Sequence, residues 1–491
     1  MNMARIKPTR LAFFCWACGS LEDRIEMKIT LSSPSTTSNK IKVSNAIIDS
    51  VMFYFFSHFR GGKCTSIFAV ICMDENESIS QVTDDPFASV KVPEYKNLII
   101  GRFFFIMALR MMGTLVGWWI YELTNDPFAI GLIGLAEVIP ALTMALYSGH
   151  VIDISEKRNL LLKTVSLYTL CAGILLFLSS PFIHDHISRH QISIGIYSVI
   201  FCTGIIRSFT GPNFTALIGT IVPRKYLQNA TTWSQGSWLS ASVIGHASGG
   251  FMIALLGNMG TMIVICSLLI ISFFILMQLK PKPILRKLGE GRTWESVQQG
   301  LRFVYKTKEL LGAFSLDMFA VLFGGAVAMV PVYARDILNI GAIGFGWLNA
   351  AADIGSIIMV IVLTISPIRK RQGRKLFFAV AGFGACIILF GLSKWFLLSF
   401  FALLISGMLD GISVVVRGTV MQLKTPDHLR GRVSSVSSMF VNSSNELGQF
   451  ESGVTAKLMG VVPSVVFGGC MTIAIVILTW VKSPSLRKFE Y

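Results

Sequence analysis

The sequence predicts an all-α integral membrane protein, with about twelve transmembrane helices in two six-helix bundles around a central cavity. Three observations lead to this prediction. Charged residues make up only 14% of the 491 residues, against about 25% in soluble domains. Long apolar runs follow one another from residue 98 onward, and the connectors between them are alternately rich and poor in basic residues. The second part of the chain also weakly repeats the first.

The apolar runs each reach about 18 residues or more, the length that a helix needs to cross a bilayer. Their approximate limits are 99–121, 128–148, 160–180, 192–217, 230–255, 260–279, 311–332, 342–365, 375–393, 396–421, 432–458 and 461–481. The eleventh run is rich in Ser, Asn and Glu. We therefore expect its polar face to meet protein or a water-filled cavity rather than lipid.

Basic residues predict the orientation. One set of connectors and the C-terminal tail are rich in Lys and Arg, whereas the alternate connectors hold only Arg189, Arg335 and Lys394. Because positively charged connectors stay in the cytoplasm, we expect both termini there, in a bacterial inner (plasma) membrane. The same distribution accounts for the net charge of +16, so nucleic acid is not an expected partner. The expected partners are the lipid bilayer, protons and a small-molecule substrate, and we expect the protein to be a monomer.

The internal repeat divides the membrane part into two halves. Gly204 and Pro223, for example, recur at one constant offset as Gly407 and Pro426. The spacing of apolar residues between 294 and 305 predicts a short amphipathic helix in the central connector, either on the membrane surface or in solvent. The predicted segments are a leader 73–97, an N-terminal half 98–279, a cytoplasmic linker 280–310, a C-terminal half 311–481 and a cytoplasmic tail 482–491.

Residues 1–72 differ from the rest of the chain. Their apolar pieces are too short to span a bilayer, and the CxxC of Cys15 and Cys18 lacks the surroundings of a redox or metal site. We interpret these residues as a non-native or disordered extension, with Met73 as the natural start. A peptide from residues 1–72 in the mass spectrum of native protein would contradict this interpretation.

The connector after the second run reads Gly149-His-Val-Ile-Asp153-Ile-Ser-Glu156-Lys157-Arg158. It resembles the loop signature of the major facilitator superfamily, except that Glu156 stands where the signature has glycine. The resemblance implies that Gly149, Asp153, Lys157 and Arg158 latch one conformational state; the alternative is charge that only sets topology. A degenerate copy at residues 370–375 has lysine in place of the aspartate.

Further motifs extend this resemblance over about residues 95–480. Arg207 and Gly211 match the arginine and glycine of the superfamily's fourth-helix signature. Residues 425–433 resemble a signature of the subgroup that includes enterobactin exporters and macrolide efflux proteins. These motifs imply a secondary active transporter.

Gly245-His246-Ala-Ser-Gly249-Gly250 resembles the fifth-helix signature of exporters, with His246 in place of proline. The resemblance implies that Gly245, Gly249 and Gly250, like Gly211, are helix-packing glycines, since small residues let helices approach closely. His246 is either a protonation site or a packing residue.

Ionisable residues inside the apolar runs are the candidates for proton coupling, because charge within a membrane is costly and usually functional. The candidate coupling residues are Glu137, Asp317, Asp353 and Asp410, led by Glu137 and Asp317. The membrane-embedded arginines are Arg110, Arg207 and Arg417, of which Arg110 and Arg417 are candidate partners of the carboxylates. The candidate cavity residues are His246, Glu446 and Glu451. The alternative for each carboxylate is a structural ion pair or an interface position, and for Arg207 it is a side chain that reaches the cytoplasmic interface.

The resemblance implies export of amphipathic small molecules, drug or siderophore-like, coupled to protons by alternating access. Three alternatives stay open: a lysophospholipid flippase, an importer of a polar solute and, from another class, a transport-inactive membrane sensor or scaffold. The sequence has no P-loop and no nucleophile or metal-ligand constellation. We therefore expect no ATP-driven transport, enzymatic activity, cofactor or metal.

Overall fold

The described part of the chain is an all-α membrane protein. The computed structural model describes residues 85–282, 293–368, 370–426 and 429–490, and these contain no β-strand. Among them, ten helical stretches are long and apolar enough to cross a membrane. This number counts α9 once and leaves out the polar α16, so the total of twelve stays a prediction. Residues 1–72, including Cys15 and Cys18, lie outside the described residues.

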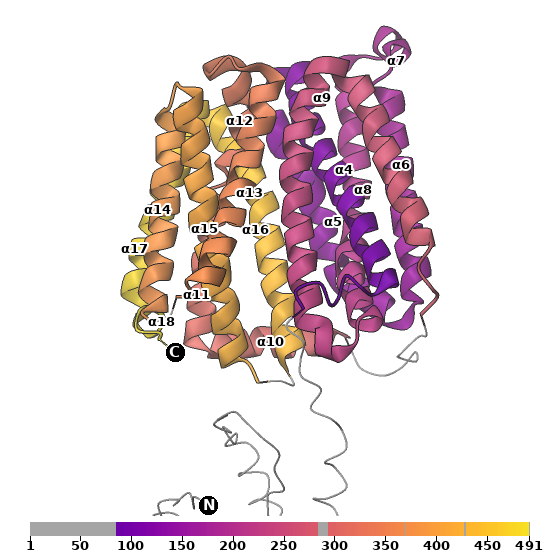
Figure 1. Cartoon of the computed structure of the whole chain (residues 1–491). Helices are drawn as coiled ribbons and strands as arrows, with labels where there is room; N and C mark the ends of the chain where they lie inside the picture. Colours follow the sequence, from indigo (N-terminus) through magenta and orange to yellow (C-terminus); the bar gives the residue numbers. More distant parts are fainter. Residues whose placement is uncertain (1–84, 283–292, 369, 427–428, 491) are drawn as a thin grey trace, which may run out of the picture. The chain divides into compact units, whose positions relative to one another are not determined.

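The N-terminal half is drawn in indigo to magenta in Figure 1. It consists of α4 (Pro93–Thr124), α5 (Pro127–Ile154), α6 (Lys157–Leu178), α7 (Pro181–His186), α8 (Arg189–Ile221), η1 (Arg224–Tyr226) and α9 (Leu227–Met277). Capping side chains start several of these helices: the Asp126 carboxylate accepts a hydrogen bond from the Phe128 N–H, and Ser188 with Gln191 forms a capping box. α9 breaks at Gly257, whose φ of 65° favours glycine.

The C-terminal half and the helix that precedes it follow in orange to yellow. They comprise α10 (Thr293–Lys306), α11 (Lys308–Phe323), η2 (Ala326–Met329), α12 (Val330–Val332), η3 (Tyr333–Ile337), α13 (Gly341–Ile365), α14 (Gln372–Leu392), α15 (Phe396–Lys424), α16 (Arg430–Met459), α17 (Val461–Lys482) and α18 (Pro484–Arg487). The helix predicted for the central connector is present as α10. The run expected over 311–332 lies within one candidate span, Lys308–Ile337, but its helix is irregular: two glycines follow Phe323, and η2, α12 and η3 continue the span.

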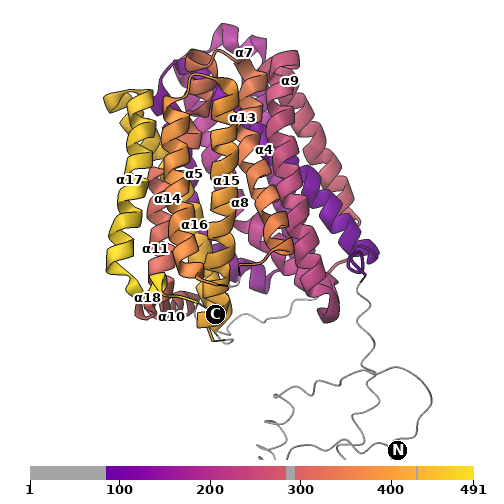
Figure 2. The same ribbon diagram turned by 60° about the vertical axis from the view of Figure 1, so that its left-hand side comes forward.

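The helical body has two ends. Both views place α7 at one end, hereafter the α7 end, and α10 with α18 at the other, hereafter the linker end (Figure 1, Figure 2). The two halves meet mainly along two helix pairs, α5 with α16 and α9 with α13. The buried apolar cluster around Tyr333 and Phe345 in the C-terminal half also takes in Tyr121 and Ile130 of the N-terminal half.

The C-terminal tail folds back onto the C-terminal half at the linker end. Leu486 is fully buried, and the Gly373 N–H donates a hydrogen bond to the Phe489 carbonyl at 3.1 Å. The Arg371 N–H donates to the Glu490 carboxylate at 3.2 Å. The degenerate loop copy at 370–375 lacks its own aspartate, and it receives a carboxylate from the tail instead.

Replacing Gly373 with alanine is expected to loosen the tail, because a Cβ there would lie 1.9 Å from the Leu486 carbonyl oxygen. Overpacking of this kind costs about 1–3 kcal/mol. The unfolding temperature in detergent should fall, and protease should cut faster at Arg487. Gly418→Ala in α15 is the matched control, because no atom lies within 4 Å of that position. Equal behaviour of the two variants would contradict this role of the contact.

Candidate functional site

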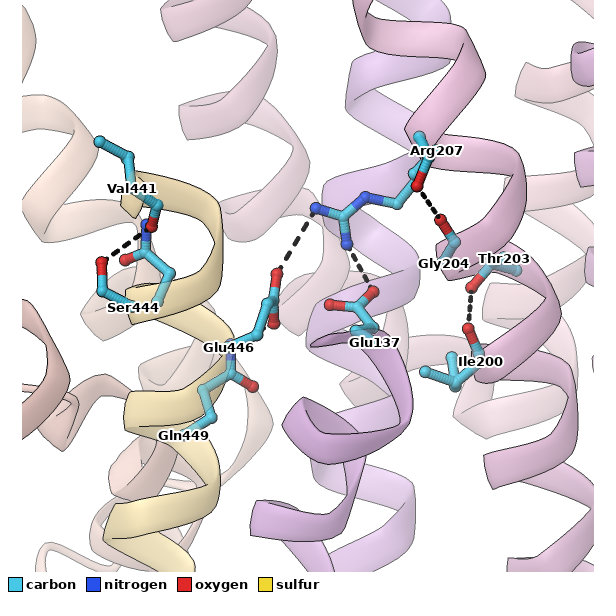
Figure 3. Close-up of polar contacts among 11 residues, drawn as sticks. Glu137, Ile200, Thr203, Gly204, Arg207, Val441, Ser444, Glu446 and Gln449 are labelled. Carbon is cyan, nitrogen blue, oxygen red and sulfur yellow. Dashed lines mark hydrogen bonds and ion pairs between the residues drawn. The ribbon is translucent and has the colours of Figure 1, made fainter. Parts of the chain in front are cut away.

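Arg207, Glu137 and Glu446 form a charged cluster at the α5–α16 interface, hereafter the arginine cluster. Arg207 Nη1 of α8 lies 2.5 Å from Glu137 Oε1 of α5, and Nη2 lies 3.7 Å from Glu446 Oε1 of α16. Figure 3 shows the guanidinium between the two carboxylates. The two glutamate side chains are only 18% and 12% exposed. An arginine of one half thus contacts a largely buried carboxylate of the other half.

Glycines bring the three helices of the arginine cluster together. A Cβ on Gly134 of α5 would lie 2.5 Å from the Glu446 carbonyl oxygen, and one on Gly131 would lie 2.9 Å from Gly453 Cα. On α8, a Cβ on Gly204 would lie 3.2 Å from the Glu137 carbonyl oxygen. Since only glycine fits at such distances, these positions allow the close approach that places the charged side chains within reach of one another.

The arginine cluster holds two carboxylates for one guanidinium. Its charge is therefore −1 when both glutamates are ionised and zero when one of them carries a proton. The Gln449 amide also donates a hydrogen bond to Glu446 Oε2 at 3.2 Å and orients that carboxylate. The arrangement can take up one proton at a contact between the two halves.

A second polar cluster joins α9 to α13. Asp353 Oδ2 of α13 accepts a hydrogen bond from the Ser242 hydroxyl at 2.5 Å and lies 3.7 Å from His246 Nε2. The other ring nitrogen of His246 shares a hydrogen bond of 2.8 Å with Thr114 Oγ1 of α4. Asp353, predicted as a coupling residue, and His246, predicted as a cavity residue, are therefore neighbours across the two halves.

Asp317 and Arg417 form an ion pair within the C-terminal half, between α11 and α15. The Ser413 hydroxyl donates to Asp317 Oδ1 at 3.2 Å. The structure thus places Arg417 beside Asp317, as expected of a candidate partner. The two leading coupling candidates, Glu137 and Asp317, lie in different halves and contact different arginines.

The remaining ionisable candidates have fewer partners. Arg110 lies with its guanidinium 5.0 Å from the Trp238 ring centre and forms no ion pair with the described side chains. Asp410 lies within electrostatic range of Asp353, and its carboxylate makes no hydrogen bond or ion pair within the described residues. Glu451 lies on α16 with its carboxylate beside Ser452.

The predicted latch residues lie at the junction of α5 and α6. Gly149 belongs to α5, and a Cβ there would meet no atom within 4 Å. Asp153 also belongs to α5, but its side chain lies outside the described part. The Lys157 carbonyl accepts a hydrogen bond from α8 at 2.9 Å, and Arg158 Nη2 donates to the last carbonyl of α9 at 2.7 Å. These contacts of the basic pair lie within the N-terminal half.

Glu156, which departs from the loop signature, caps α6 and holds the start of the linker. Its carboxylate accepts hydrogen bonds from the N–H groups of Arg158, Asn159 and Lys282 at 3.1, 2.7 and 2.7 Å. Burial alone would raise the pKa of Glu156, but these donors outweigh it and hold the pKa below its ordinary value. A glycine at this position could not accept these three hydrogen bonds, because it has no side chain.

Replacing Glu156 with alanine is expected to speed amide hydrogen exchange at Arg158, Asn159 and Lys282, with a loss of about 1 kcal/mol from the cap. Because the folded-state pKa is lowered, the carboxylate stabilises the fold above its unfolded pKa of about 4.3 and loses this effect as the pH falls through the folded value. The difference between wild type and variant should therefore vanish at low pH. Unchanged exchange at Lys282 would contradict the contact.

Three of the predicted packing glycines lie at close helix contacts. A Cβ on Gly245 would lie 2.7 Å from the Met107 carbonyl oxygen, and one on Gly249 would lie 3.3 Å from Met111 Cα, both in α4. A Cβ on Gly250 would lie 2.3 Å from the Ala342 carbonyl oxygen in α13. Gly211 is the exception, since no atom lies within 4 Å of its Cβ position, and it makes no close helix contact in this structure.

A further set of contacts, at the α7 end, is not foreseen from the sequence. The Tyr121 hydroxyl of α4 donates to the Asp336 carboxylate of η3. Lys457 of α16 forms an ion pair of 3.5 Å with Asp126. Asp126 before Pro127 is a recognisable helix start, but nothing in the sequence indicates its partner. These contacts close the two halves on each other at the α7 end.

The sequence is similar to those of known membrane proteins. The family described as transmembrane secretion effectors matches residues 86–490. The enterobactin exporter EntS of Escherichia coli O1:K1 / APEC is 23% identical over 407 residues, which cover 81% of this chain and 94% of that protein. The enterobactin exporter EntS of Shigella boydii serotype 18 matches with the same identity and coverage.

Solved structures share the fold. A POT family transporter in complex with a thioalcohol conjugated peptide superimposes with a TM-score of 0.64 at 12% identity, covering 80% of this chain and 96% of that one. The nucleoside transporter NupG superimposes with a TM-score of 0.61 at 11% identity, covering 81% and 100%.

Proposed function

Because this chain belongs to the transmembrane secretion effectors of the major facilitator superfamily and is a membrane transporter, we propose that it exports amphipathic small molecules in exchange for protons. The proposed substrates are drug-like or siderophore-like, and transport proceeds by alternating access. Similarity to enterobactin exporters supports export of a small molecule. The observation that carries proton coupling is the arginine cluster, because its one guanidinium faces a carboxylate from each half.

In this proposal, proton binding and separation of the halves are linked at Glu446. Arg207 and Glu446 sit on opposite halves, so their attraction exists only while α5 and α16 are together. When both glutamates are ionised, the joined cluster carries one excess negative charge, and a proton on Glu446 removes its repulsion from Glu137. Protonation therefore favours the joined arrangement, and loss of the proton favours separation.

The basic connectors orient the cycle. We place the linker end, with both termini, in the cytoplasm of a bacterial inner membrane, because the Lys- and Arg-rich connectors belong to that end. The contacts at the α7 end then close the outer side. Substrate enters from the cytoplasm, the α7 end opens to release it, and Glu446 takes up a proton from outside. Protonation favours closure of the α7 end, and the proton then leaves to the cytoplasm. One chain contains all the residues of this cycle, so we propose a monomer.

The test is an accumulation assay in an efflux-deficient bacterium that expresses the full chain. Dyes, macrolides and siderophores should accumulate less, and a protonophore should abolish the difference. Glu446→Gln should abolish it as well, whereas Asp185→Asn, at an exposed position of α7, should retain it. No change across the panel, with the protein confirmed in the membrane, would contradict export. Increased accumulation would instead indicate an importer.

A further inference from the structure

The hydrogen bonds around His246 favour one of its ring nitrogens as the one that carries a hydrogen. The Thr114 hydroxyl donates its one proton to the Arg110 carbonyl, a turn earlier in α4, at 3.0 Å. With the hydroxyl proton on that carbonyl, Thr114 Oγ1 can only accept from His246, and we assign His246 Nδ1 as the donor of the 2.8 Å bond between them. Nδ1 thus carries a hydrogen in every protonation state that keeps this contact.

This assignment leaves Nε2 facing a carboxylate. In neutral histidine Nε2 then has only a lone pair, and it points at Asp353 Oδ2 at 3.7 Å. That oxygen already accepts the Ser242 hydroxyl. Two acceptor atoms face each other favourably only when one proton lies on the pair, either on Nε2 as an imidazolium or on the aspartate.

The surrounding charges also leave room for one proton. Arg110 of α4 and Asp410 of α15 both lie within electrostatic range of Asp353. On α9 the facing groups are His246 and Ser242. With neutral histidine and both aspartates ionised, these groups carry a net charge of −1, and one proton brings it to zero.

The pair exists only while α9 and α13 are in contact. On the side of the α7 end, a Cβ on Gly346 would lie 2.8 Å from the His246 carbonyl oxygen and 2.9 Å from Gly250 Cα. The two backbones therefore touch next to the pair. If the helices separate, Asp353 loses both Ser242 and His246.

We propose that His246 and Asp353 form a second proton-binding site, which takes up one proton when α9 and α13 are together. The proposal rests on the proposed function for its place in transport. Its sign is the same as that of the arginine cluster, since in both a proton removes an excess negative charge and favours contact between the halves. It also gives a role to histidine at the position where the exporter signature has proline.

The test is the 15N spectrum of histidine-labelled full chain in lipid nanodiscs, with the His246 signal identified by its loss in His246→Gln. Between about pH 5 and pH 9, His246 should appear as the imidazolium or as the neutral form protonated on Nδ1. In Asp353→Asn, the amide can donate to Nε2, so His246 should stay neutral and stop responding to pH. The signal of exposed His190 should be the same in both proteins and serves as the internal control.

Two results would overturn the inference: a neutral His246 protonated on Nε2, or a pH response that Asp353→Asn leaves unchanged. Transport in proteoliposomes separates this from the proposed function. If the protein transports, Asp353→Asn should remove one proton from the number exchanged per substrate, and Asp185→Asn, at an exposed position of α7, should not. If it does not transport but the His246 response depends on Asp353, the proposed function fails and the proton site stands.

Discussion

Replacing Arg207 with leucine is expected to abolish transport. The substitution leaves two largely buried carboxylates, Glu137 and Glu446, without a cation and removes the ionic contact between the halves. Arg207 is itself 39% exposed, so the loss of stability should lie below the about 3–5 kcal/mol that breaking a fully buried pair costs. Lysine keeps the charge but lacks the planar fork that reaches both carboxylates, so Arg207→Lys should retain only part of the activity.

Substrate efflux per amount of membrane-inserted protein measures this effect. The double substitution Arg207→Leu with Glu446→Gln removes one of the stranded carboxylates. It should restore the amount of folded protein but leave transport absent. A single Arg207→Leu protein that transports at the wild-type rate would rule out the arginine cluster as the coupling site.

Replacing Gly250 with alanine is expected to drive the protein out of the conformation described above. Its Cβ would lie 2.3 Å from the Ala342 carbonyl oxygen and 2.7 Å from Gly346 Cα. These are backbone atoms, so α9 and α13 must move apart to admit the methyl group. With an overpacking cost of about 1–3 kcal/mol, transport should fall about tenfold or more.

Hydrogen exchange at the start of α13 checks the displacement and should become faster. The matched control is Gly236→Ala on the same helix, where no atom lies within 4 Å and alanine is the better helix former. The control should transport as the wild type does. If the two variants behave alike, the glycine contact is not what sets the spacing of the two helices.

Most of the fold follows from apolar run length, because a bilayer accepts only segments whose backbone hydrogen bonds are satisfied internally. Apolar run length does not show where a helix is interrupted when the segment is buried in protein. The chain between Phe323 and Gly341 passes through η2, α12 and η3, and its apolar composition resembles that of a continuous helix. Packing against the other half tolerates this irregular backbone.

The candidate site was only partly predictable. Arg207 stands out in the sequence because a charged arginine inside an apolar run is energetically costly and is usually functional. Its partner Glu446 is a candidate cavity residue because it lies on the polar eleventh run, but its contact with Arg207 depends on how two distant halves meet. The contacts of Ser242 and Thr114 are harder still to predict, because Ser and Thr in helices usually form hydrogen bonds only within their own helix.

The glycine contacts at the two interfaces have a consequence for the driving force. Where Gly131 meets Gly453 and Gly250 meets Gly346, there are no side chains to reorder when the helices part. At these points the equilibrium between joined and separated helices depends mainly on the neighbouring ionised groups. Membrane voltage acts on such groups directly, at about 2.3 kcal/mol per elementary charge across 100 mV. A transporter built in this way responds to the electrical part of the proton-motive force as well as to the chemical part.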